Sequence, residues 1–295
     1  MKKFKIISLL LLVALMSTLL EGCLGKGDND PFLSFSTRTS RMSNLWDVTK
    51  FNGDYHLKLN SGENRIITFR QSGLSVSETT DYIKMSEATQ DSLQAGQDTT
   101  IEWKGKLLEA FYDIRDDGTF DFAYEYVLEK THSKKYEDGN PNPITPFFPA
   151  YPGKPFTMDS IMTRNYRTEY RGRWNFLDKI DGWKDDQRIV FEIESASLVT
   201  NYSVTYVCDA DDDDGTWANN DPVDTTFSSQ SLESVYEKFA NGENNDVWEI
   251  DGLNGSSVTM KRPLDYIFTH ALTGLEGYKS TKKGSELFEL EEKAK

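Results

Sequence analysis

From residue 46 onward, apolar side chains recur at every second position over much of this chain. This period is typical of a strand that buries one face, because successive side chains of a strand point to opposite sides of the sheet. The clearest run is Phe120, Phe122, Tyr124, Tyr126 and Leu128. A second apolar run precedes it: Leu108, Ala110, Tyr112 and Ile114. Asp116, Asp117 and Gly118 separate the two and predict a hairpin turn, since glycine takes a positive φ without steric cost.

The same alternation returns later in the chain. Residues 166–176 and 189–193 form two apolar faces, and Asp181 with Gly182 predicts the turn between them. Residues 201–208 are predicted as a further strand that pairs back on the second of these. A third hairpin is predicted at its turn residues, 251–255. Strands joined by hairpins form a meander, and a meander with one apolar face must close or be covered. The sequence therefore predicts a mainly β fold, an antiparallel up-and-down β-barrel.

Three segments depart from this pattern. Residues 141–155 are rich in proline, which cannot donate the amide hydrogen bond of a central strand, and we expect a long extended loop there. A short helix is predicted before Gly242 from apolar residues with helical spacing: Leu232, Val235, Tyr236 and Phe239. Residues 271–295 carry many lysines and glutamates, and they predict a charged tail that is mobile or helical.

The N-terminal residues have the pattern of a secretory signal. Several lysines precede an apolar run over residues 6–20, which is followed by Gly22 and Cys23. At about 1.5 Å of rise per residue, this run is too short to cross a hydrocarbon core of about 30 Å. We therefore expect cleavage before Cys23, with a flexible tether over residues 23–42.

A formal net charge of −15 makes the chain strongly acidic. Such a charge repels phosphate backbones and anionic head groups, so we expect no nucleic-acid partner and no electrostatic adhesion to membranes. The chain has two cysteines, Cys23 and Cys208. The first ends a secretory signal of the kind whose final cysteine is lipidated, so an internal disulfide is excluded. The fold must then depend on a hydrophobic core, and a mature chain of this length can bury one.

Residues 20–23 resemble the bacterial lipobox, in which the final residue, here Cys23, carries the lipid. Glu21 departs from the usual lipobox pattern. Lys26, followed by acidic residues, resembles the short export signal that sends lipoproteins of the Bacteroidetes group to the outer face of the outer membrane. The resemblance implies a protein that is anchored to the outer membrane by acyl chains and faces the cell surface.

Later segments resemble the lipocalin-like lipoproteins of the same group. Residues 42–48 resemble the lipocalin opening, with Asn44 in place of its glycine, and residues 172–176 and 245–251 resemble two later strand pairs. The resemblance implies a lipocalin-like or calycin-like barrel and supplies no catalytic residues. The expected organisation is a signal peptide at 1–22, a lipidated tether at 23–42, a lipocalin-like β-barrel domain at 43–270 and a charged C-terminal tail at 271–295.

The sequence holds no catalytic motif, and an enzyme is the least favoured interpretation. Asp209, Asp211 and Asp213 have the alternating spacing of calcium-binding loops, which supply carboxylate oxygens to the ion. A solvated acidic hairpin tip explains the same residues. Weak calcium binding therefore stays an open alternative, and no other cofactor is expected.

The aromatic alternation carries a further hypothesis. If the barrel holds a cavity, four rings on two predicted strands would contact a ligand: Tyr124, Tyr126, Tyr170 and Trp174. Without a cavity the same rings form ordinary core. Two functions follow: binding of a small hydrophobic or glycan ligand, or a non-catalytic structural or interaction role in a surface assembly with a protein partner.

Overall fold

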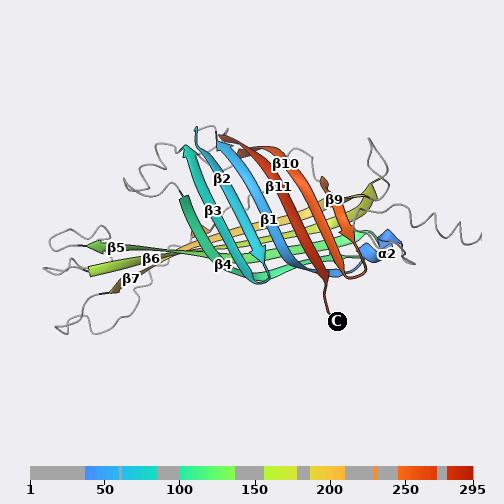
Figure 1. Ribbon diagram of the computed structural model, residues 1–295, viewed down its shortest axis with the longest axis horizontal. Helices are drawn as coiled ribbons and strands as arrows, with labels where there is room; N and C mark the ends of the chain where they lie inside the picture. Colours follow the sequence, from blue (N-terminus) through green and yellow to red (C-terminus); the bar gives the residue numbers. More distant parts are fainter. Residues whose placement is uncertain are drawn as a thin grey trace, which may run out of the picture.

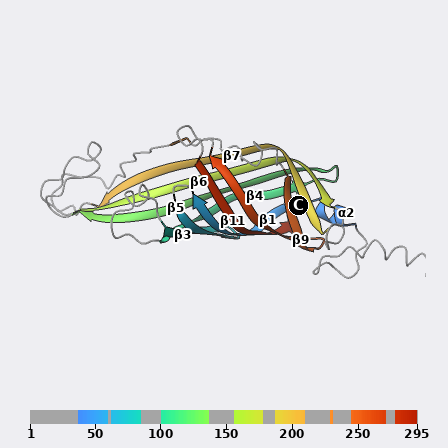
Figure 2. The ribbon, with the colours of Figure 1, turned by 90° about the horizontal axis from the view of Figure 1, so that it is seen from above.

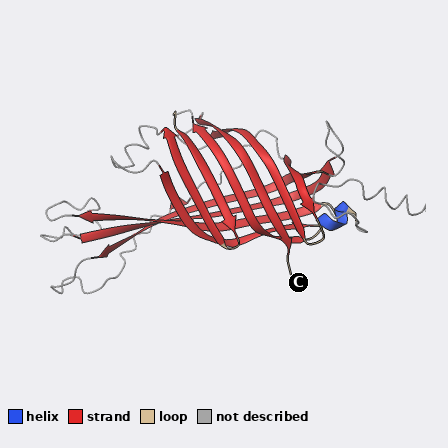
Figure 3. Cartoon of the chain, viewed as in Figure 1, coloured by secondary structure: helices blue, strands red, loops and turns tan. Residues whose placement is uncertain are grey.

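The computed structural model describes residues 37–59, 62–84, 100–136, 156–177, 187–209, 229–230, 245–270 and 278–294. One short helix, α2 (Arg38–Met42), precedes the strands. The strands are β1 (Leu45–Leu59), β2 (Asn64–Ser72), β3 (Ser75–Lys84), β4 (Thr100–Ile114), β5 (Thr119–Tyr136), β6 (Phe156–Leu177), β7 (Arg188–Asp209), β8 (Ser229–Gln230), β9 (Asn245–Leu253), β10 (Ser257–His270) and β11 (Tyr278–Glu292). Strands make up nearly all of the described chain (Figure 3), so the mainly β prediction is confirmed.

All of these strands belong to one antiparallel sheet, in the order β6-β5-β4-β3-β2-β1-β11-β10-β9-β7-β8. β6 also pairs with β7, so the hydrogen-bonded neighbours follow one another around a near ring. The pairing that closes it is short, because β9 meets β7 only along residues 188–192. β1 also pairs with β4 at this end of the sheet, along residues 45–47.

The sheet curls over itself, and β5, β6 and β7 pass behind the steeper strands β1, β2, β10 and β11 (Figures 1 and 2). Short connections at residues 73–74, 115–118 and 254–256 join strands at one end, which we call the turn end. At the opposite end, the distal end, longer stretches of sequence separate β3 from β4, β5 from β6 and β10 from β11. β5, β6 and β7 also reach farther than the other strands (Figure 1).

The predicted faces and hairpins are confirmed where the alternation is unbroken. Phe120, Phe122, Tyr124 and Leu128 of β5 are buried, and their neighbour Tyr126 packs against the core. The turn between β4 and β5 lies at residues 115–118, and its glycine has φ +83°. The hairpin between β9 and β10 is also present, although β9 continues to Leu253 before it turns.

Two predictions fail where the strand pairing shifts. Leu108 was expected on the buried face of β4, yet it is 48% exposed, because an irregularity between Leu107 and Glu109 turns it outward. Residues 201–208 were expected to form a separate strand that pairs back on 189–194. They continue β7 instead, which pairs with β6 along almost its whole length, past a register shift at Gly172.

The predicted charged tail is wrong for residues 278–292, which form β11 between β1 and β10. Phe288 and Leu290 of this strand are buried in the core. Glu286 is buried as well, and its position on the inner face departs from the rule that charged residues of a strand face water. The last strand in the sequence therefore lies in the middle of the sheet.

The helix α2 lies within the segment predicted as a tether. Thr37 caps it, because its Oγ1 accepts a hydrogen bond from the amide of Ser40 at 3.1 Å. Met42, at its end, is fully buried and accepts a hydrogen bond through its carbonyl from Trp46 Nε1 at 2.8 Å. Trp46 itself has no exposed surface, so the N-terminal part of the described chain covers the core at the turn end.

Several predicted features lie outside the described residues. They are the signal peptide with Cys23, the tether up to residue 36, the proline-rich segment 141–155, and the helix expected near Leu232. Among the described residues, no helix is long and apolar enough to cross a membrane.

Candidate functional site

Charged side chains lie on the inner face of the sheet, above its apolar core. Alternation along each strand places Glu78 beside buried Val76 and Thr80, and Lys282 on the same face as buried Glu286. Arg65 shares its face of β2 with buried Phe69, and Arg164 shares its face of β6 with Tyr166. We call Arg65, Glu78, Arg164 and Lys282 the inner charge cluster.

Below this cluster, a network centred on Arg262 joins one cation to two carboxylates. The Arg262 guanidinium forms ion pairs with Asp246 and Glu286, at 2.6 Å for the latter, and lies 4.1 Å from the centre of the Trp248 ring. Tyr55 Oη donates a hydrogen bond to the other oxygen of Glu286 at 2.8 Å. Burial and the Glu286 charge raise the pKa of Tyr55 well above its ordinary value, so this tyrosine remains a donor. We call these groups the Arg262 network.

In the inner charge cluster, Arg164 lies flat on an aromatic ring. Its guanidinium carbon is 3.9 Å from the centre of the Trp103 ring, a close cation–π contact. Among the described residues, its nearest carboxylate oxygen is Glu78 Oε1, also 3.9 Å away, at the limit of an ion pair. Burial raises the pKa of the Glu78 carboxyl, even though Arg164, Arg65 and Lys282 all act to lower it.

Lys282 has a similar position over a ring. Its Nζ lies 3.6 Å from the centre of the Tyr55 ring, and no carboxylate of the described residues lies within 4.0 Å of it. Burial lowers the pKa of this ammonium, and the charges of Glu286 and Glu78 only partly oppose that shift. Gly53 makes room for the arrangement, because a Cβ there would lie 2.1 Å from Tyr55 Oη.

The four tyrosine and tryptophan residues predicted as ligand contacts do not form one site. Tyr124 and Tyr170 lie in a closely spaced aromatic core with Phe122 and Phe288. Tyr126 stacks on Tyr166, with the ring centres 4.9 Å apart, and faces the inner charge cluster. Burial raises the pKa of Tyr126, and the neighbouring Tyr166 and Glu78 raise it further.

Trp174 lies at the turn end instead. Its indole Nε1 donates a hydrogen bond to the carbonyl of Arg115 at 2.8 Å, and its amide donates to the carbonyl of Gly118 at 2.8 Å. Eight positions of β6 separate it from Tyr166, roughly 26 Å at the rise of a strand. Trp174 therefore fixes a turn and cannot share a small ligand with Tyr126.

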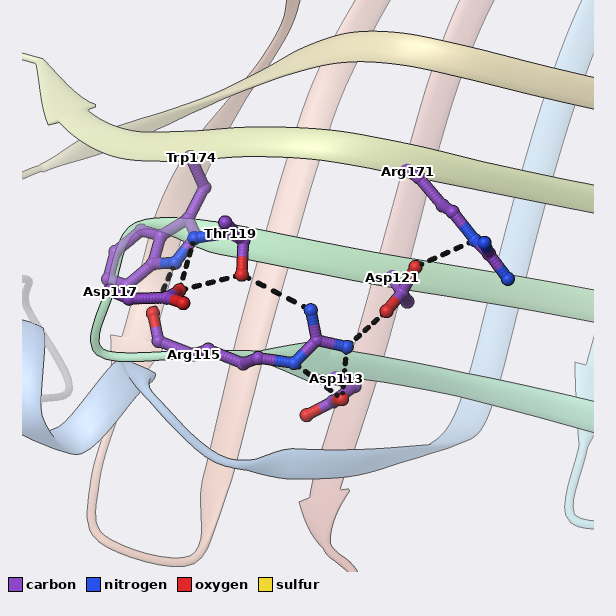
Figure 4. Close-up of polar contacts among 7 residues, drawn as sticks. All are labelled: Asp113, Arg115, Asp117, Thr119, Asp121, Arg171 and Trp174. Atoms are coloured by element: carbon purple, nitrogen blue, oxygen red, sulfur yellow. Dashed lines mark hydrogen bonds and ion pairs between the residues drawn. The ribbon is translucent and has the colours of Figure 1, made fainter.

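A second polar group surrounds that turn (Figure 4). Asp113 and Asp121 are direct cross-strand neighbours, which would repel each other. The Arg115 guanidinium lies between them and bonds both carboxylates, at 2.6 Å to Asp113. Arg171 adds an ion pair to Asp121 at 3.0 Å. Asp117 accepts from the amide and hydroxyl of Thr119, and these bonds lower the pKa of Asp117. The group thus stabilises the hairpin.

An open hollow of about 550 Å³ lies beside this turn. It is lined by Thr37, Thr39, Ser40, Ser43, Ile114, Arg115, Asp116 and Asp117. Arg115 is the one cation among the described lining residues, and it already bonds two carboxylates and the Thr119 hydroxyl, so these residues offer few groups that could hold a charged ligand.

The predicted calcium residues lie largely outside the described chain. The backbone of Asp209 pairs with Thr157 at the distal end of β7, whereas Asp211 and Asp213 follow it in residues that the structure does not describe. Within the described parts, no group of three histidine, cysteine, aspartate or glutamate side chains could hold a metal ion.

Comparison with known proteins gives no relative for this chain: no family model, no curated protein and no solved structure matches it. The inner charge cluster was not predicted from the sequence. The cluster could have been found in the sequence from charged residues at positions where the alternation predicts an inward side chain. Glu78, two residues after Val76, is such a residue. Sequence rules assign such a residue to the surface.

Proposed function

We propose that this chain is a lipid-anchored protein of the bacterial cell envelope whose curled sheet acts as a lipocalin-like barrel and binds a small ligand from its distal end. The observation that carries the proposal is the inner charge cluster, in which Glu78 and Lys282 are desolvated and Arg164 and Lys282 lie on aromatic rings above a filled core. A desolvated charge lowers the stability of a fold unless another group compensates it. Such charges are concentrated at functional sites, where a bound ligand can be the compensating group.

The ligand site lies above the aromatic core rather than inside it. Phe51 stacks on Phe288 at 4.4 Å and meets Phe69 at 5.1 Å, so side chains occupy the interior below Tyr55. A ligand would contact Trp103, Tyr126 and the charges around them. This position favours a polar ligand such as a glycan over a long hydrophobic one.

Binding is tested with the full chain purified from membranes. Native mass spectrometry should detect a small molecule that copurifies, and calorimetry should show that a sugar or a short amphiphile binds with a stoichiometry near one. Intact mass should place the N-terminus at a lipid-modified Cys23. A chain that carries no lipid and binds no small molecule would contradict the proposal.

A structural role in a surface assembly remains the second candidate, and the long strands favour it. β4 pairs with β5 only as far as Glu129, so residues 130–136 form no backbone pairing on that side with the described strands. An unpaired strand edge can accept a strand from a partner. A photo-crosslinker at the exposed Thr131 should then capture one partner in intact cells, whereas a ligand-binding protein should give no crosslink at this edge.

A further inference from the structure

We propose that the inner charge cluster binds the carboxylate or phosphate group of a small ligand, with Lys282 and Arg164 in contact with the anion. This inference rests on the proposed ligand-binding function and names the chemical class of the ligand.

The charge balance of the cluster supports an anion. Arg65, Arg164 and Lys282 face Glu78, and Glu63 pairs with Arg65 at 3.4 Å. Together with Lys130 and the Arg262 network, five cations meet four carboxylates on the inner face, although the whole chain has a formal charge of −15. Lys130, on the inner face of β5, lies close enough to Arg164 for the two charges to repel. One singly charged anion would balance this excess.

The two central cations are held in place without a strong ion pair. Arg164 lies 3.9 Å from the Trp103 ring centre and Lys282 lies 3.6 Å from that of Tyr55. A ring face offsets part of the desolvation of a cation and leaves its charge uncancelled. Cations fixed in this way bind an anion with little further loss of side-chain freedom, which is the advantage of preorganisation.

Accessibility separates this cluster from the Arg262 network. The side chains of Arg164 and Arg65 are 34% and 28% exposed, whereas that of Arg262 is 10% exposed and already bonds two carboxylates. A ligand can therefore reach Arg164, which has donors for a bidentate contact with a carboxylate or phosphate. The Arg262 network is a poor anion site because its donors are already used.

The chemistry also excludes two other ligand classes from the cluster. A cation would meet three positive groups around Glu78, and a purely apolar molecule would leave all of these charges desolvated. Glu78 competes with the proposed anion for the same cations. Removal of its charge should therefore strengthen the binding of an acid, and this prediction has the opposite sign to that for Lys282.

The test compares acidic and neutral probes of the same shape by calorimetry on the purified full chain. Octanoate is compared with octanol, and D-glucuronate and glucose 6-phosphate are each compared with D-glucose. Octanoate and D-glucuronate test a carboxylate on an alkyl chain and on a sugar, and glucose 6-phosphate tests a phosphate. At least one acid should bind more tightly than its neutral partner, and which acid does so identifies the anionic group.

Lys282→Met should weaken the binding of that acid by about tenfold or more, the loss expected for a hydrogen bond to a charged group. The matched control is Lys283→Met, because Lys283 points outward and pairs with Asp265 at 2.9 Å. It should leave binding unchanged. Arg164→Met should weaken binding as Lys282→Met does, and Glu78→Gln should strengthen it.

Two results would overturn the inference and leave ligand binding intact. One is equal binding of acidic and neutral probes, or binding of a neutral molecule alone. The other is an acid whose affinity is the same in Lys282→Met and Lys283→Met. If no probe binds and no small molecule copurifies, the inference and the proposed function both fail.

Discussion

The interior at the turn end holds buried apolar side chains, whereas the interior nearer the distal end holds charged ones. At the turn end, Trp46, Ile250, Leu253 and Leu290 have no exposed surface, and the strand pairings β1–β4 and β7–β9 bring the sheet near to a ring. Toward the distal end the ring loses the pairing between β7 and β9, and the inner charge cluster replaces the apolar core. The two parts therefore contribute differently to the free energy of unfolding.

Burial of apolar surface drives folding, so the turn end supplies most of the stability of the described chain. Buried charges rarely add to it, because desolvation offsets their mutual attraction. The contrast suggests that the charges near the distal end are retained for binding. Substitutions in the two parts can break or sharpen this contrast.

The largest effect is expected from Trp46→Ala at the turn end. The substitution leaves a cavity beside α2 and removes the hydrogen bond to the carbonyl of Met42, so the free energy of unfolding should fall by about 3–5 kcal/mol. Urea denaturation measures it. The control is the partly exposed neighbour Leu45→Ala, which should cost less than about 1 kcal/mol. Equal losses for the two would mean that the turn end is not the stable part.

A somewhat smaller loss, about 3 kcal/mol, is expected from Arg262→Met. It leaves Asp246 and Glu286 buried without their shared cation. The adjacent Lys261→Met is the control, since Lys261 is 42% exposed and its pairs lie at the surface. Addition of Glu286→Gln to Arg262→Met should restore part of the loss. A double variant no more stable than Arg262→Met would show that buried charge is not the cause.

The sequence predicts the strands with apolar inner faces better than those with charged inner faces. Where apolar residues alternate without interruption, as along β5, the face, the strand and the turn at Gly118 are predicted correctly. The pattern fails at Leu108 and in the middle of β7, because a bulge shifts the parity of the residues that follow.

β11 and the candidate site were missed for a different reason. Lys282 and Glu286 face inward, so the apolar alternation of β11 reduces to Phe288 and Leu290, which is too short to identify a strand. Glu78 and Arg164 are likewise inward charges that propensity rules place outside. Only tertiary contacts with rings such as Trp103 make these positions favourable, and no local pattern contains those contacts.

At the surface of the turn end, Arg115→Met should cost about 1 kcal/mol. It removes the cation between Asp113 and Asp121, which then repel across the strand pair. The effect stays small because the Arg115 side chain is 40% exposed, and it should shrink further in 1 M salt. Arg171→Met, at a side chain that is 79% exposed, should have almost no effect. A loss at Arg115 that salt does not change would argue against the electrostatic account.

The smallest effect is a pH dependence that comes from Glu78 in the inner charge cluster. Burial raises its folded pKa above the ordinary value of 4.5, so between the two values the native state holds a proton that the unfolded chain has lost. Stability should therefore fall as the pH rises through the folded pKa.

Glu78→Gln removes this dependence. The variant should match the wild type below about pH 4, where both carry a neutral side chain, and become the more stable of the two at pH 7. Urea denaturation at both pH values measures the difference. A variant that is less stable than the wild type at pH 7 would show that Glu78 is well paired, and the contrast between the two ends would then lose its electrostatic basis.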